Sequence, residues 1–158
     1  MSRKFTPPVR ATEKGFLVDL SDHERQLLTR LMGELRELLT EDDHPYLDRL
    51  FPTAYPEDDE AESEYQRLMR EELVTSRTMS IDTVTELLDR PPDQLLDEGE
   101  TLAFLQSVNA IRLVLGTMLG ISDDGDAERI DEGDGSEQQL YGYLSWLLEW
   151  TVQALSGR

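Results

Sequence analysis

Cysteine is absent from this chain of 158 residues. Without a thiol the protein cannot form a disulfide, bind a metal through thiolates or use a thiol nucleophile. Histidine, which titrates and binds metals near neutral pH, occurs only as His23 and His44. These absences exclude thiol redox switching and leave a metal centre with no thiolate ligand and few imidazole ligands.

Long apolar runs are also missing. No stretch approaches the roughly 20 apolar residues that span a bilayer. The segment Met1–Gly15 lacks the apolar run of a signal peptide. We therefore expect a cytoplasmic protein.

Positive charge is scarce. Asp and Glu total 34 against 15 Lys and Arg, which gives a formal net charge of -19, and the only lysines are Lys4 and Lys14. Nucleic acids and anionic lipids are bound largely through cationic side chains that neutralise phosphates, so an acidic surface repels both. The acidity is consistent with a solubilising surface, with salt adaptation, or with docking to a basic partner.

Leucines at helical spacing are the main apolar residues of the sequence. The length fits a single domain over residues 1–158. We predict a mainly α fold, a compact bundle of about five to six helices behind a short N-terminal β-ribbon. The ribbon is expected to pair Lys4–Val9 with Gly15–Leu20 in an extended arm over residues 1–20, because Pro7 and Pro8 oppose helix there. Helical segments are predicted at residues 21–40, 46–51, 57–89, 97–119 and 136–155.

The ends of these helices carry capping patterns, in which a Ser or Asp side chain and a Glu or Gln three residues later satisfy each other's free backbone donors. The patterns are Ser21 with Glu24, Asp97 with Glu100, and Ser136 with Gln139. Gly120 is expected to end the third long helix, and residues 121–135 predict a mobile acidic loop. Whether the helix over 57–89 breaks near Arg70 stays open.

Two of the predicted helices, 97–119 and 136–155, are apolar on nearly their whole circumference. Such helices cannot both lie on the surface of a monomer. Trp146 and Trp150, four residues apart, and Tyr143 are the candidate interface, since interfaces favour large aromatic side chains. Ordinary core packing and a homodimer are the two alternatives.

Asn109 and Arg112 are polar residues inside the apolar segment 97–119. A buried polar group without a partner costs about 1–3 kcal/mol, so we expect Glu64, or else Glu86, to pair with Arg112. One interpretation is a buried ion pair that fixes helix register. The other is an anion or ligand site.

The segment over 57–70 is expected to turn Tyr65, Leu68 and Met69 toward the core.

Motifs of catalysis and metal binding are missing as well. His44 follows three carboxylates, but the fixed spacing of a metal site is not visible. The segment Asp123–Glu137 resembles a calcium loop only in composition. Nucleophile elbows, phosphate loops and dinucleotide glycine patterns are absent. We expect no enzyme activity, no cofactor and no metal.

Three stretches carry a family resemblance that spans about Phe16 to Leu155. They are Arg49–Tyr55 with the acidic residues that follow, Asn109–Gly116 ahead of Leu119 and Gly120, and Tyr141–Trp150. In these stretches the chain resembles an actinobacterial family, the domain-of-unknown-function family 2017, commonly encoded beside the ClpS protease adaptor. The resemblance implies a helical cytosolic protein.

Mycobacterial members of that family, called AosR, are described as oxidative-stress transcriptional regulators that work with a sigma factor through a thiol switch. An AosR-like role is therefore implied by resemblance. This chain departs from the pattern because it has no cysteine, which excludes such a switch. Ala110 also stands where relatives often carry aspartate.

These observations lead us to expect a regulatory or interaction protein that acts on transcription or the stress response indirectly. Its partners would be proteins, by resemblance a sigma factor or a ClpS-related protein, and not nucleic acid or membrane. The alternatives are a small ligand-binding protein or enzyme with a pocket around Asn109 and Arg112, and a partner in ClpS-linked proteolysis.

Overall fold

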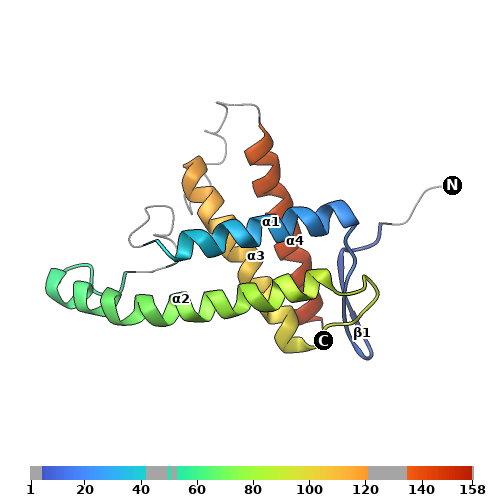
Figure 1. The fold of residues 1–158 in the computed structure, drawn as a ribbon, viewed down its shortest axis with the longest axis horizontal. Helices are drawn as coiled ribbons and strands as arrows, with labels where there is room; N and C mark the ends of the chain where they lie inside the picture. Colours follow the sequence, from blue (N-terminus) through green and yellow to red (C-terminus); the bar gives the residue numbers. More distant parts are fainter. Residues whose placement is uncertain (1–4, 42–49, 51–52, 121–134, 158) are drawn as a thin grey trace.

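The computed structural model describes residues 5–41, 50, 53–120 and 135–157. Its elements, in chain order, are β1 (Val9–Thr12), β2 (Gly15–Val18), α1 (Asp22–Leu39), α2 (Asp59–Asp89), α3 (Glu98–Leu119) and α4 (Ser136–Ser156). The mainly helical fold with an N-terminal ribbon is confirmed. Helices α3 and α4 pack along each other and cross α1 and α2, while the ribbon lies beside the C-terminal end of α2 (Figure 1).

The ribbon is antiparallel, but its first strand lies further along the chain than predicted. Strand β1 begins at Val9 and not at Lys4, and Val9 pairs with Val18 while Thr12 pairs with Gly15. The prolines at positions 7 and 8 explain the difference, since proline has no N–H to donate to a strand partner. Pro8 contributes only its carbonyl, which accepts from the Asp19 N–H at 2.7 Å.

The ribbon is attached to the helices through Phe16 and Leu96. Each N–H donates to the other residue's carbonyl at 2.8 Å, and the Phe16 side chain is 0% exposed. Gly15 makes this approach possible. Its φ is +154°, and a Cβ at this position would lie 2.6 Å from the Leu96 carbonyl oxygen.

Helix α1 begins as the sequence indicates. Ser21 and Glu24 form the predicted capping box, and the buried side chains Leu28, Met32, Leu35 and Leu39 share one face. Four-residue and three-residue spacing places them on a single stripe of the helix. This stripe packs against α2 and α3.

Helix α2 corrects the predicted number of helices. It is one continuous helix of 31 residues, and four helices occur among the described residues, not five to six. No glycine or proline lies between Asp59 and Asp89, so nothing in the sequence breaks the helix near Arg70. Of the turn predicted at residues 46–51, all but Leu50 lies outside the described residues.

Helix α3 is the central helix of the fold. Its predicted caps are confirmed: Asp97 and Glu100 form a capping box, and Gly120 ends the helix with a φ of +77°. Among the described helices α3 alone is long and apolar enough to cross a membrane, and half of the apolar window is buried. Core helices of globular domains share these properties, and α3 here packs against α1, α2 and α4.

Helix α4 begins differently from the prediction. Gly135, with a φ of +80°, precedes the first helical residue, and no side chain caps the helix at this position. Ser136 is therefore the first residue of the helix and not its cap. The rest of the predicted acidic loop, residues 121–134, lies outside the described residues.

The close approach at Gly15 predicts the effect of adding a methyl group. The Gly15→Ala variant should lose about 1–3 kcal/mol of unfolding free energy, because the new Cβ strains the backbone and separates Phe16 from Leu96. Urea unfolding followed by circular dichroism measures this.

Gly33→Ala is the matched control. Gly33 is an exposed residue within α1 with no atom near its Cβ position, so alanine should raise stability by about 0.5–1 kcal/mol. If both variants changed stability in the same direction, the account of Gly15 would be wrong.

Candidate functional site

Asn109 and Arg112, the candidate polar network, lie together on α3. One guanidinium nitrogen of Arg112 donates to the Asn109 side-chain oxygen at 2.9 Å, and another donates to the Tyr141 hydroxyl of α4 at 3.1 Å. The guanidinium also lies 5.8 Å from the centre of the Tyr141 ring. The cluster therefore joins α3 to α4 through neutral partners.

The carboxylates expected to pair with Arg112 lie elsewhere. Glu64 is an exposed residue of α2 whose ion pair is with Arg67, three residues along the same helix, and Glu86 pairs with Arg90. None of the ion pairs among the described residues includes Arg112. The structure thus brings Asn109 and Arg112 together but does not bring Glu64 to them. The spacing of residues in the sequence did not identify Tyr141 as a partner of Arg112, because the two lie 29 residues apart in the chain.

The candidate interface residues form an aromatic cluster on α4. The rings of Tyr143 and Trp146 lie 6.0 Å apart. Phe5 reaches the same cluster from the N-terminal arm, with its ring centre 6.3 Å from Trp146 and 5.3 Å from Trp150. Trp146 remains 39% exposed and Phe5 62% exposed. Part of the face predicted to meet a second subunit is therefore covered by the protein's own arm.

Tyr143 also bonds to α1. Its hydroxyl donates to a carboxylate oxygen of Glu24 at 2.7 Å, while the other oxygen accepts from the Ser21 N–H. Burial raises the pKa of Glu24, but these hydrogen bonds outweigh burial and the net pKa is lowered. Burial, followed by the bond to Glu24, raises the pKa of Tyr143. One carboxylate therefore caps α1 and ties it to α4.

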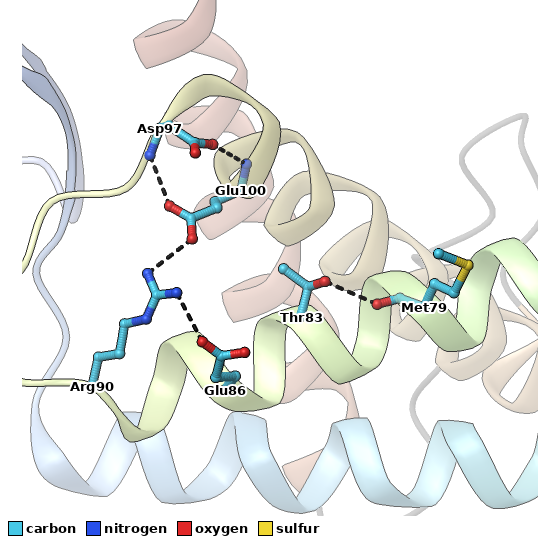
Figure 2. A network of polar contacts seen from close by, with 6 residues as sticks. All are labelled: Met79, Thr83, Glu86, Arg90, Asp97 and Glu100. Carbon is cyan, nitrogen blue, oxygen red and sulfur yellow. Dashed lines mark hydrogen bonds and ion pairs between the residues drawn. The ribbon is translucent and has the colours of Figure 1, made fainter.

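Two arginines join the elements at the C-terminal end of α2. Arg25 of α1 donates to the Leu88 carbonyl at 3.1 Å and to the Val18 carbonyl at 3.3 Å. Arg90 contacts Glu86 and Glu100, each at 2.9 Å. Figure 2 shows Arg90 between α2 and the start of α3, with Glu100 also bonded to Asp97.

Next to this corner lies an open groove between α2 and the start of α3, which we call the α2–α3 groove. Its volume is about 850 Å³. The lining residues from α2 are Leu68, Glu71, Glu72, Thr75, Ser76, Met79, Ser80 and Thr83, and Asp97, Gly99, Glu100 and Ala103 complete it. No Lys, Arg or His is among the described residues that line it.

The groove corrects the expected orientation of Leu68, which is 61% exposed and does not point to the core. Met79, eleven residues later on the same face, is 66% exposed. The buried residues of α2, Ile81, Val84, Leu87 and Leu88, follow a different stripe. Extending that stripe back along the helix would have identified Leu68 as exposed, because 20 residues at about 3.6 per turn place Leu68 roughly 200° around the helix from Leu88.

Other hollows of the described surface include two further grooves. One, of about 740 Å³, lies between α1 and α2 beside Arg25 and Asp82. The other, of about 220 Å³, is apolar and lies among α1, α3 and α4 beside Leu38 and Met118. Asn109 and Arg112 line neither of these grooves nor the α2–α3 groove.

Metal ligands do not gather in the part of the chain that the structure describes. No group of three or more His, Asp or Glu side chains there is placed to hold an ion. His23 is exposed on the first turn of α1, and His44 lies outside the described residues.

Comparison with known proteins gives one match. Residues 3–155 match the family described as Domain of unknown function (DUF2017). No curated protein and no solved structure matches the chain.

The Glu24–Tyr143 bond predicts a pH-dependent contribution to stability. A carboxylate whose pKa is lowered by folding stabilises the native state above its unfolded pKa of about 4.3, and that contribution is lost as the pH falls through the lower folded value. Tyr143→Phe should therefore cost about 1 kcal/mol at pH 7, with the cost shrinking below about pH 4. Urea unfolding across the acid range measures this.

Tyr141→Phe is the matched control, because its hydroxyl accepts from the Arg112 guanidinium and does not donate to a carboxylate among the described residues. Its cost should not change with pH. An equal pH dependence in both variants would rule out Glu24 as the titrating group.

The network around Arg112 predicts a coupled loss of stability. Arg112→Ala should lower the unfolding free energy by about 1–3 kcal/mol, and adding Asn109→Ala should cost less than the sum of the two single changes. A double-mutant cycle by chemical unfolding measures the coupling. A stable Arg112→Ala variant that lost a thermal shift given to the parent protein by phosphate or sulfate would instead support an anion site.

Proposed function

The chain belongs to the DUF2017 family, and on that premise we propose that it is a non-enzymatic cytoplasmic protein that acts through contacts with other proteins. Its arginine clusters are engaged in joining elements of the fold: Arg25 and Arg90 join α1, α2 and α3, and Arg112 joins α3 to α4. Groups engaged in this way are poorly placed to act on a substrate. This favours an interaction protein over an enzyme.

The charge of the chain supports protein partners over nucleic acid. The formal net charge is -19, and nucleic-acid affinity depends on cations that neutralise phosphates. An influence on transcription would therefore pass through a partner. By family resemblance that partner is a sigma factor or a ClpS-related protein. A thiol switch plays no part, because the chain has no cysteine.

One observation carries the proposal: most of α2 contributes little to the core. Over residues 59–80 of this helix no side chain is fully buried, and the buried residues all lie between Ile81 and Leu88. Leu73 and Val74 pack partly buried against the core, and the exposed residues of this part of the helix offer a long, ordered surface. Such a surface is suited to docking a partner.

The other expected functions have weaker support. A ligand pocket around Asn109 and Arg112 gains no support from the three grooves described above, because neither residue lines any of them. A role in ClpS-linked proteolysis depends on the family resemblance alone. The homodimer stays a prediction. Less of the aromatic face on α4 is free to meet a second subunit, because Phe5 of the same chain packs against Trp150.

Two measurements on the purified full chain test the proposal. Fluorescence anisotropy with labelled duplex DNA at physiological salt should show no binding in the nanomolar range, as the net charge requires. Affinity capture from native lysate with the tagged chain should enrich specific proteins, and nuclease treatment should leave that enrichment unchanged. Nanomolar DNA binding, or enrichment that nuclease abolishes, would contradict the proposal.

A further inference from the structure

The α2–α3 groove runs along several turns of α2. Its α2 residues recur at three- and four-residue spacing from Leu68 to Thr83, which places them on one face of the helix. At about 1.5 Å per residue this face is roughly 22 Å long. It has the length of a helix-binding surface rather than of a small-molecule pocket.

The free charged groups in the groove are negative. Glu71 and Glu72 project from α2 without an ion-pair partner among the described residues. The hydroxyls of Thr75 and Thr83 are bonded to carbonyls of their own helix, as Figure 2 shows for Thr83 and Met79. The carboxylates are therefore the charged groups left to recognise a ligand, beside the neutral hydroxyl of Ser76.

Two apolar side chains border these carboxylates. Leu68 and Met79 are 61% and 66% exposed, and their eleven-residue separation corresponds to roughly 16 Å along the helix. Large apolar side chains so exposed, with charges between them, are typical of surfaces that bind an amphipathic helix. Methionine in particular adapts to different partner side chains.

Charge decides between the occupants of such a groove. A second copy related by a two-fold axis would bring Glu71 and Glu72 close to their own copies, and like charges repel. Nucleic acid would bring phosphates against the same carboxylates. A cationic partner is attracted by these carboxylates in every orientation.

We propose that the α2–α3 groove binds a positively charged amphipathic helix of a partner protein, with apolar residues against Leu68 and Met79 and lysines or arginines against Glu71 and Glu72. This inference depends on the function proposed above and specifies the class of partner. Thr75 and Ser76 line the middle of the groove and leave room for the partner's side chains.

Binding of designed peptides to the purified full chain tests the proposal. The probe is a fluorescein-labelled helical peptide of about 18 residues, long enough to cover the groove. It carries leucines eleven positions apart and Lys or Arg on the flanking positions. The comparison peptide has the same leucines with Glu in place of each Lys and Arg. Fluorescence anisotropy should show saturable binding of the basic peptide only.

Variants of the chain locate the site. The double change Glu71→Arg and Glu72→Arg, and separately Leu68→Ser with Met79→Ser, should each raise the Kd of the basic peptide by about tenfold or more. The matched control is Glu37→Arg with Glu149→Arg. It changes net charge equally at exposed positions of α1 and α4 outside the groove, and should change the Kd by less than about twofold.

Two results would overturn the groove as the binding site. One is equal weakening by the groove and control charge variants, which would show attraction to overall charge alone. The other is no peptide binding at a concentration of about 1 mM. If proteins captured from lysate remained bound to the Glu71→Arg, Glu72→Arg variant while the peptide did not bind, the groove proposal would fail and the proposed function would stand.

Discussion

The guanidinium of Arg25 makes the contacts on which the arrangement of the other elements depends. From α1 it donates to the carbonyls of Leu88 and Val18, and so joins three elements at one point. The last turn of α2 contains no basic residue of its own, and a cation there also complements the negative end of the helix dipole. Arg90 extends the junction to Glu100 on α3. Held at this end, α2 extends beyond the bundle (Figure 1), and one of its faces lines the α2–α3 groove.

The sequence predicts best what depends on neighbouring residues. Capping boxes at Ser21 and Asp97 need only residues three apart, and both are present in the structure. Contacts between segments that are distant in the sequence could not be predicted in this way. The bond of Arg112 to Tyr141 and the contact of Phe5 with Trp150 depend on how helices and arm pack together. Composition suggested a carboxylate for Arg112 because acidic residues are so many, yet two of its nitrogens bond to the neutral Asn109 and Tyr141, and Glu64 remains exposed.

The acidic residues fall into two groups, those that stabilise the fold and those that do not. Some serve the fold, as Glu24 does in capping α1 and binding Tyr143. Others, such as Glu71 and Glu72, have no such use among the described contacts. A surface with unpaired carboxylates next to exposed Leu68 and Met79 combines the two features that attract a basic amphipathic helix. The absence of cysteine means that any regulation of this contact uses chemistry other than thiol oxidation.

Amide chemical shifts of the isotope-labelled full chain, followed by NMR during titration with a basic amphipathic helical peptide, give the most direct measurement of where a partner docks. The α2–α3 groove predicts that the shifting amides lie between Leu68 and Thr83 on α2 and between Gly99 and Ala103 on α3. Amides of α4 around Trp146 should stay unchanged. Shifts confined to the aromatic cluster of α4, or spread evenly over all helices, would contradict a docking surface on α2.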